Sequence, residues 1–373
     1  MKLVFQKDAL LNGISIVSKA IPSKTTMTIL ECILINADAN DIKLTGNDME
    51  LGIETKVEGS ILERGKIALE AKLFYEIIRK LPDGDTPVTI TSDNRFNTVI
   101  ECENAVFNIQ GRDGDEFSYI PYIEKNKYIS LSQFTLKEVI QQTIFSISPN
   151  DSNKMMAGEL FEVNENQLKV VSLDGHRISI RNVTLKDHYE NTKVIVPGKT
   201  LSEISKILGG DNEKEVLIYF SANHILFEFD QTMVVSRLIE GEYFRIDQML
   251  SSDYETKLSI NKKEFLDCID RATLLVREGD KKPIIIHITD GSMELKIDSA
   301  MGSMNEDIDI EKEGKDILIG FNPKFLIDAL KVIDDETIDI YLVNPKAPCF
   351  IRDEEETYTY LILPVNINQN QAR

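Results

Sequence analysis

One short segment of the chain holds residue types that could perform acid–base chemistry. Asp174 and His176 lie two residues apart in Leu173-Asp174-Gly175-His176-Arg177, and a histidine close to a carboxylate is a common general base. The sequence contains no GxSxG elbow, Walker loop, HExxH pair or Rossmann glycine pattern to accompany them. A hydrolase that uses Asp174 and His176 is therefore an alternative interpretation, and we expect a protein without catalytic residues.

Residues that could hold a metal or a disulfide show no pattern of either kind. The four cysteines are scattered without a CxxC pair, which favours reduced thiols in a cytoplasmic protein, with no metal and no cofactor. The N-terminus has no apolar signal segment, and no apolar run approaches the length of a membrane span. We expect no membrane partner.

Three features recur in the same order at intervals of roughly 125 residues. Each copy begins with a strand and an amphipathic helix, continues with a pair of alternating strands, and ends with a strand, a second helix and a strand. The helix segments are expected at 6–24, 70–80, 133–148, 198–208, 262–282 and 322–333. The repeat predicts an α+β protein of three modules, at 1–125, 126–254 and 255–373.

The distribution of charge differs between the helices and the rest of the chain. The net charge is −20, which at first argues against a nucleic-acid partner. The six predicted helix segments, however, contain 17 basic and 11 acidic residues, a net +6. If packing brings the helices together, they would form a basic face on an otherwise acidic protein.

Five stretches, in order and in register with the repeat, resemble the family of bacterial DNA polymerase III beta subunits, the beta sliding clamps. They are LTGNDMELGI from Leu44, VVSLDGHRISI from Val170, KVIVPGKTLSE from Lys193, IGFNPKFLIDAL from Ile319 and YLILPV from Tyr360. The resemblance covers nearly the whole chain. It implies three tandem clamp modules with helices inside and antiparallel sheets outside, closed into a six-module ring by a head-to-tail homodimer.

The resemblance also implies the function and its partners. The ring would encircle double-stranded DNA without sequence specificity, and it would tether the replicative DNA polymerase, the clamp loader and repair proteins through short clamp-binding peptides. Positions that match DNA contacts of the family are Lys24, Lys72, Arg79, Asn150, Lys154, Met155 and Lys199, with Met155 standing where some relatives carry tyrosine.

Two further sets of residues follow from the same resemblance. The partner-peptide pocket would consist of Met156, Leu173, Gly175, His176, Arg177, Ile178, Phe244, Gln248, Met249, Leu361, Ile362, Leu363, Pro364 and Val365. The segment from Tyr243 to Gln248 lacks the proline that relatives usually have. The dimer interface would use Phe107 and Ile109 on one side and Leu274 and Leu275 on the other. A non-catalytic structural repeat protein is the remaining alternative.

Overall fold

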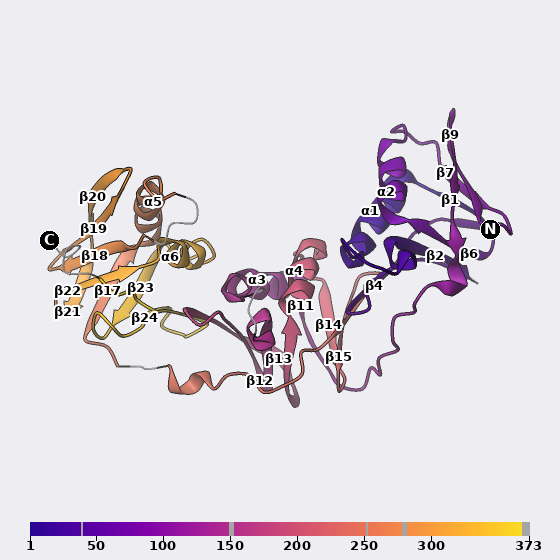
Figure 1. Ribbon diagram of the computed structural model, residues 1–373. Helices are drawn as coiled ribbons and strands as arrows, with labels where there is room; N and C mark the ends of the chain where they lie inside the picture. The colour runs from indigo at the N-terminus through magenta and orange to yellow at the C-terminus, as the bar shows by residue number, and fades with distance from the viewer. Residues whose placement is uncertain (39, 149–152, 251–252, 278–281, 368–373) are drawn as a thin grey trace. The chain divides into compact units, whose positions relative to one another are not determined.

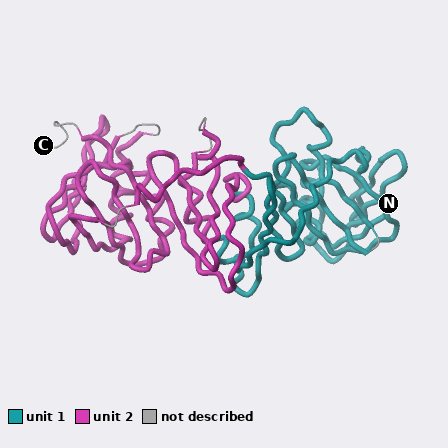
Figure 2. Tube along the Cα trace, turned by 90° about the horizontal axis from the view of Figure 1, so that it is seen from below, with its two compact units in different colours: residues 1–137, 202–238 teal, residues 138–201, 239–373 magenta. Residues whose placement is uncertain are grey.

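The computed structural model describes residues 1–38, 40–148, 153–250, 253–277 and 282–367. They form two compact units: one contains residues 1–137 and 202–238, and the other contains residues 138–201 and 239–373 (Figure 2). We call them unit 1 and unit 2. Among the described residues, no helix is long and apolar enough to cross a membrane.

Unit 1 contains two antiparallel sheets (Figure 1). The smaller has the strand order β5 (Ser60–Glu63), β1 (Lys2–Phe5), β7 (Val88–Ser92), β8 (Asn97–Cys102) and β9 (Ala105–Gln110). The larger has the order β10 (Arg112–Asp113), β6 (Gly65–Glu70), β2 (Cys32–Asp38), β3 (Asp41–Asn47), β4 (Leu51–Lys56), β16 (Thr232–Arg237), β15 (His224–Phe229), β14 (Glu215–Phe220) and β11 (Tyr128–Ser132).

Unit 2 also contains two antiparallel sheets. The larger has the order β12 (Gly158–Leu173), β13 (Arg177–Pro197), β25 (Tyr358–Ile362), β24 (Cys349–Arg352), β23 (Thr337–Leu342), β17 (Thr256–Asn261) and β21 (Glu311–Gly314). The smaller has the order β20 (Gly302–Asp309), β19 (Ser292–Ser299), β18 (Ile284–Thr289) and β22 (Ile317–Phe321).

Strand pairing explains why the compact units do not end at the predicted module boundaries. β4 pairs with β16 in unit 1, and β13 pairs with β25 in unit 2. Each pairing joins strands from two different predicted modules into one hydrogen-bonded sheet. The three-module division therefore stays a prediction from the repeat, since contacts cross the predicted boundaries.

Six α-helices occupy the places that the repeat predicts, but several are shorter. They are α1 (Lys7–Val17), α2 (Ala71–Lys80), α3 (Gln133–Thr143), α4 (Gly198–Ile207), α5 (Lys262–Thr273) and α6 (Pro323–Leu330). α1 ends at Val17 and continues only as a 3₁₀ turn over Ser18–Ala20. The hydroxyls of Ser15 and Ser18 bond to the carbonyls four residues earlier, a contact that weakens helix interiors.

The same lysine contact holds the two helices together in each copy of the repeat. The ammonium group of Lys7 donates to the carbonyl of Leu81 (2.6 Å), that of Lys137 donates to Leu208 (3.0 Å), and that of Lys262 donates to Ile333. All three carbonyls lie just beyond the C-terminal end of the second helix, where helix carbonyls lack partners and cations are favoured. The positive charge of these lysines thus stabilises the fold.

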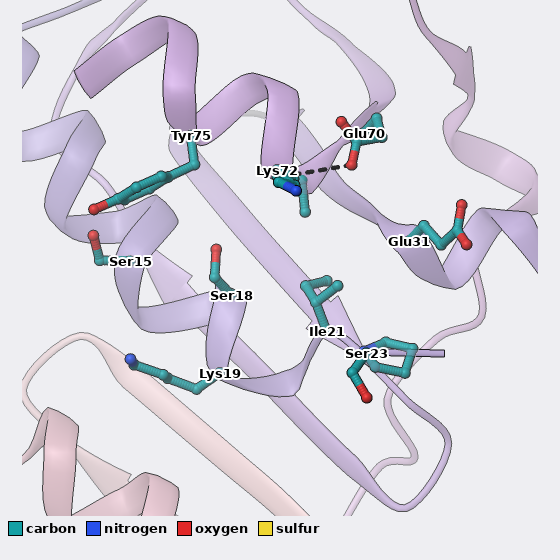
Figure 3. Close-up of a pocket in the computed structure, with 11 residues that line it drawn as sticks. Ser15, Ser18, Lys19, Ile21, Ser23, Glu31, Glu70, Lys72 and Tyr75 are labelled. Carbon is teal, nitrogen blue, oxygen red and sulfur yellow. Dashed lines mark hydrogen bonds between the residues drawn. The ribbon is translucent and has the colours of Figure 1, made fainter. Parts of the chain in front are cut away.

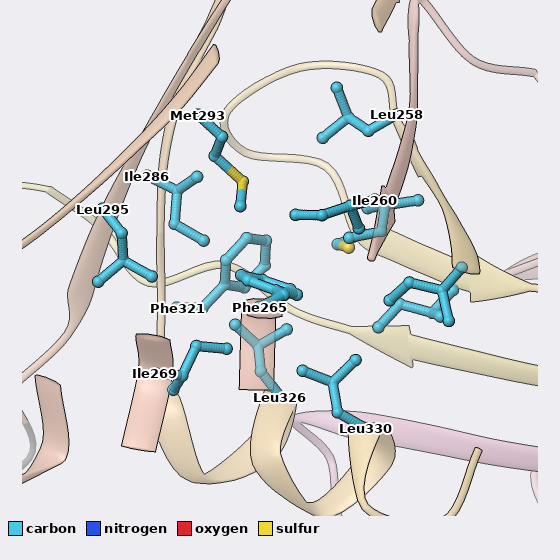
Figure 4. Packing of buried hydrophobic residues seen from close by; sticks show 14 of the residues in the cluster. Leu258, Ile260, Phe265, Ile269, Ile286, Met293, Leu295, Phe321, Leu326 and Leu330 are labelled. Carbon is cyan, nitrogen blue, oxygen red and sulfur yellow. The ribbon is translucent and has the colours of Figure 1, made fainter. Parts of the chain in front are cut away.

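The core of the last copy shows how the sheets and helices pack. Phe265 and Ile269 of α5 and Leu326 of α6 lie against side chains from the small sheet of unit 2, such as Ile286 and Phe321 (Figure 4). Each of these five side chains is at most 3% exposed. The helix face formed by apolar residues three and four apart packs against the sheet face formed by alternate apolar residues of the strands, as the sequence pattern predicts.

Candidate functional site

The predicted DNA contacts of unit 1 lie at exposed positions. Lys72 is the second residue of α2. The Glu70 carboxylate caps the first turn of this helix and accepts from the N–H groups of Lys72 (3.1 Å) and Leu73 (2.6 Å). Arg79 lies in the last turn of α2 and pairs with Glu76 (2.6 Å). Lys24 lies in the loop between the 3₁₀ turns that follow α1. Lys72 also lines a cavity of about 680 Å³ beside α1 (Figure 3).

The predicted contacts of unit 2 divide into two kinds. Lys154 and Lys199 are exposed, at the start of a 3₁₀ turn (Lys154–Ala157) and of α4. Met155 is half-buried and packs against an apolar cluster in the same unit. Met155 therefore lies with the predicted peptide pocket. Asn150 lies outside the described residues.

The helical basic face is weaker than the sequence count suggests. Within the described residues, the six α-helices contain eleven basic and eight acidic side chains, a net +3 where the longer predicted segments had +6. Three of the eleven are the lysines that bond to carbonyls at the ends of the second helices. The other eight helical cations make no such contact among the described residues, so the structure withdraws three of the eleven from a possible ligand.

An apolar cluster in unit 2 brings together residues of the predicted peptide pocket from distant parts of the chain. Leu173, Ile178 and Leu361 are buried in it, and Met156 and Phe244 pack against it half-buried. Met249 is 52% exposed and Leu363 is 37% exposed. Gly175, His176 and Gln248 are exposed, and Pro364 and Val365 are half-buried.

The backbone joins the C-terminal strand to this cluster. Leu361 pairs with Ile178 in the register of β25 and β13, and the N–H of Leu363 donates to the carbonyl of His176 (2.9 Å). Ile362 points the other way, into the core around α5 and α6. Sequence reasoning missed Tyr341 and Phe350, which belong to the same cluster. The alternation of apolar and polar residues along β23 and β24 could have indicated them. That alternation alone does not show which face of the sheet their side chains lie on.

Arg177 is buried in an ionic network. Its side chain is 7% exposed, Nε contacts Asp174 (3.0 Å), one terminal nitrogen contacts Asp328 of α6 (2.7 Å), and the other donates to the carbonyl of Phe145 (2.5 Å). The guanidinium carbon also lies 4.5 Å from the ring centre of Phe325. Arg177, a predicted pocket residue, thus ties the hairpin between β12 and β13 to α6.

The Asp174 and His176 pair does not have the geometry of a catalytic dyad. One Asp174 carboxylate oxygen accepts from the backbone N–H of His176 (2.9 Å), and the other accepts from Arg177 Nε. The His176 ring stacks on Phe325, 6.0 Å between centres. Among the described residues, the imidazole makes no hydrogen bond to the carboxylate. The carboxylate orders a turn and pairs with an arginine.

The predicted dimer residues lie on a terminal strand in unit 1 and directly after α5 in unit 2. Phe107 and Ile109 belong to β9, the last strand of the small sheet of unit 1. Leu274, directly after α5, is 75% exposed, and Leu275 is half-buried against the core of unit 2. The strand β20 is the last strand of the small sheet in that unit.

One buried carboxyl group in unit 2 has no charged partner in the described residues. Glu159 is fully buried, its Oε2 lies 3.0 Å from the Thr143 hydroxyl, and its Oε1 has no hydrogen-bond partner there. Burial raises the pKa of Glu159 to about 8. The Thr143 hydroxyl has one proton and lies 2.7 Å from the Val139 carbonyl, so a protonated Glu159 can donate to that hydroxyl.

The thiols and carboxylates form no metal centre in the part of the chain that the structure describes. No group of three or more histidine, cysteine, aspartate or glutamate side chains could hold a metal ion there. All four cysteines are buried and unpaired. Burial raises the pKa of Cys349 to about 12, which makes this thiol a poor nucleophile.

Comparisons with known proteins agree along nearly the whole chain. Residues 1–121, 130–244 and 247–366 match the family models described as the N-terminal, central and C-terminal domains of the DNA polymerase III beta subunit. The chain is 35% identical to the beta sliding clamp of Staphylococcus aureus, over 98% of this chain and 99% of that protein.

Solved structures give the same result. The chain is similar to a putative DNA polymerase III beta subunit from Eubacterium rectale, with 68% identity and a TM-score of 0.95, over 98% of this chain and all of the other. It is also similar to the DNA polymerase sliding clamp of Bacillus subtilis, with 34% identity and a TM-score of 0.94, over 99% of this chain and all of that one. The predicted α+β fold with antiparallel sheets is confirmed.

Proposed function

Because this chain belongs to the DNA polymerase III beta subunit family, we propose that it is a sliding clamp that encircles duplex DNA and performs no catalytic step itself. The observation that carries the proposal is the order of the three matched domains, which follow one another from residue 1 to residue 366. Relatives named beta sliding clamps match over almost their full length, which supports the same function.

Contact with DNA would be electrostatic and independent of sequence. Lys24, Lys72, Arg79, Lys154 and Lys199 are candidate contacts to phosphates, which carry no base information. The small positive excess of the helices suits this role, because retention by a closed ring is topological and tight phosphate binding would slow sliding. The strongly acidic remainder of the chain would disfavour DNA contacts elsewhere.

Ring closure would join β9 of one protomer to β20 of a second copy. Both are terminal strands of their sheets, and an edge strand presents unpaired N–H and C=O groups to a partner strand. Phe107 and Leu274 would supply apolar contact beside that pairing. Two different surfaces on one chain make a head-to-tail contact, and two copies close if the rotation permits.

The proposal is tested by retention on DNA of different topology. After loading by the clamp loader with ATP, the wild-type dimer is expected to stay on closed circular DNA and to leave within minutes when one cut makes the DNA linear. Equal retention on both forms, measured by gel filtration, would contradict encirclement.

The Leu274→Asp/Leu275→Asp variant is the matched control for ring closure. A charge placed in an apolar contact without a partner is costly, so the variant should be monomeric by light scattering and should leave circular DNA. A variant that remained dimeric would place the interface elsewhere.

Partner proteins would bind the surface beside the apolar cluster of unit 2. Met249 and Leu363 are exposed there and Phe244 is half-buried, which suits apolar anchors of a short peptide. Methionine side chains adapt easily to different anchors. The replicative polymerase, the clamp loader and repair proteins would compete for this surface in the cytoplasm.

Leu363→Ser should weaken peptide binding about tenfold, the effect of losing roughly 1.4 kcal/mol of apolar contact. Leu363 follows β25, and its side chain is partly exposed, so the fold should be retained. Leu62→Ser, an exposed leucine of β5 in unit 1, is the matched control. Fluorescence anisotropy with a labelled clamp-binding peptide measures the affinity of each variant. Equal affinities would exclude Leu363 from the site.

The two alternatives have less support. A hydrolase would need the Asp174 carboxylate to orient the His176 ring, whereas this carboxylate bonds to Arg177. A purely structural repeat protein does not account for similarity over the full length of named sliding clamps.

A further inference from the structure

A basic hollow in unit 1 lies outside the set of predicted DNA contacts. Its volume is about 710 Å³, and its walls come from α1, the end of β4, the last turn of α4, the segment before β14, and the turn between β15 and β16. Four lysines line it, namely Lys19 from the 3₁₀ turn after α1, Lys56 from β4, Lys206 from α4 and Lys214 from the segment before β14. The only carboxylate in its described lining is Asp230.

The four lysines differ in their existing partners. Lys56 pairs with Asp41 (2.9 Å), Lys206 with Glu203 (2.7 Å) and Lys214 with Asp230 (3.0 Å). Lys19 has no ion pair within the described residues, although it is only half-exposed. Ion pairs at exposed positions contribute little stability, so the three paired lysines can turn toward an anion at small cost.

Hydrogen bonds join the strands that form one wall of the hollow. The Thr55 and Thr232 hydroxyls are hydrogen-bonded to each other (2.8 Å), and the N–H of Lys56 donates to the carbonyl of Gln231 (3.0 Å). Both contacts fasten β4 to β16 beneath the hollow. The Asp230 carboxylate already accepts from the Gln133 amide (3.0 Å) and from Lys214, which reduces its repulsion of an entering anion.

Lys19 also borders the second hollow of unit 1, which contains Lys72. Figure 3 shows the Lys19 side chain extending away from Glu31 and Glu70, the two carboxylates of that hollow. Lys19 therefore links Lys72 in one hollow to Lys206 and Lys214 in the other. A strand of DNA carries successive phosphates that could contact lysines in both hollows, whereas a single small anion would occupy only one hollow.

We propose that the four-lysine hollow receives a phosphate of the DNA backbone and that Lys19 is its direct ligand. The inference rests on the proposed sliding-clamp function and adds a contact to it. Two adjacent hollows that share one lysine would hold neighbouring phosphates of one strand. Such contacts involve no base edge, so they are compatible with sliding.

The test compares Lys19→Gln with Lys2→Gln in the full-length dimer. Lys2 is an exposed lysine of β1 in the same unit, with no ion pair among the described residues, and it points away from the core residues Leu3 and Phe5 on its strand. Anisotropy of a labelled 30-base-pair duplex is measured between about 30 and 200 mM salt. Each lost phosphate contact reduces the slope of log K against log salt by about 0.9.

We expect Lys19→Gln to reduce the slope by about 0.9 and Lys2→Gln to leave it unchanged. Equal slopes for both variants, with salt-dependent binding by the wild type, would overturn the Lys19 contact alone. Wild-type binding that did not depend on salt would overturn the phosphate contact, whereas failure of the loaded wild type to stay on closed circular DNA would overturn the DNA-clamp proposal itself. A further outcome combines two results: pyrophosphate competes with the duplex at constant ionic strength, and Lys19→Gln leaves the salt slope of duplex binding unchanged. This outcome would indicate a site for free anions and overturn the inference.

Discussion

Replacing Arg177 by methionine is expected to destabilise unit 2 by about 3–5 kcal/mol, because it leaves carboxylates without their buried counter-charge. Arg177 is 7% exposed, and its partners Asp174 and Asp328 are both largely shielded. The variant also loses the hydrogen bond to the Phe145 carbonyl and the ring contact with Phe325. Urea unfolding followed by circular dichroism measures the change.

A double-mutant cycle separates the ion pair from the rest of the network. Asp328→Asn removes the charge that Arg177→Met leaves unpaired, so the double variant should lose less stability than the sum of the two single changes. Strict additivity would mean that the pair between Arg177 and Asp328 contributes nothing. Arg181→Met is the control. Arg181 is a basic neighbour on β13 with a longer contact to Glu138 (3.8 Å), so this variant should lose less stability.

The Arg177 network also bears on peptide binding. It fastens the turn before β13 to α6, and β13 pairs with the C-terminal strand that ends at Ile362. We therefore expect Arg177→Met to lower the affinity for the labelled peptide even at temperatures where the variant remains folded. Unchanged affinity in the folded variant would limit the role of Arg177 to stability.

Glu159→Gln is expected to stabilise unit 2 by roughly 3 kcal/mol at pH 7 and very little at pH 4. Burial raises the pKa of Glu159 to about 8 from an ordinary value of 4.5. Below pH 4.5 the carboxyl is protonated in both the folded and the unfolded chain, so it contributes no penalty. Between pH 4.5 and about 8 the unfolded chain releases the proton first, and stability is lost as the pH rises.

The measurement is the free energy of unfolding of the wild type and the variant at pH 5 and pH 8. The glutamine amide can donate to the Thr143 hydroxyl in place of the protonated carboxyl, so that the local packing is kept. The stability gap should widen by several kcal/mol at pH 8. A gap of equal size at both pH values would show that Glu159 is ionised in the fold.

The sequence predicted the helices well where a capping residue and an apolar face coincide. α2 begins at Ala71, directly after the capping carboxylate of Glu70, within one residue of the predicted start. The first helix was predicted to run to residue 24, whereas α1 ends at Val17. Apolar spacing continues past that point, but hydroxyl bonds to the backbone near Ser18 accompany the change to a 3₁₀ turn.

The sequence by itself determined the threefold repeat, the family and the absence of known catalytic motifs, because each of these depends on residue order. Tertiary structure decided which charged side chains remain available. Lys7, Lys137 and Lys262 bond to the ends of neighbouring helices, and Arg177 joins two distant carboxylates. The periodicity of a sequence indicates which face is buried. The partner of a buried charge instead depends on segments, here up to 151 residues apart, that meet only in the folded chain.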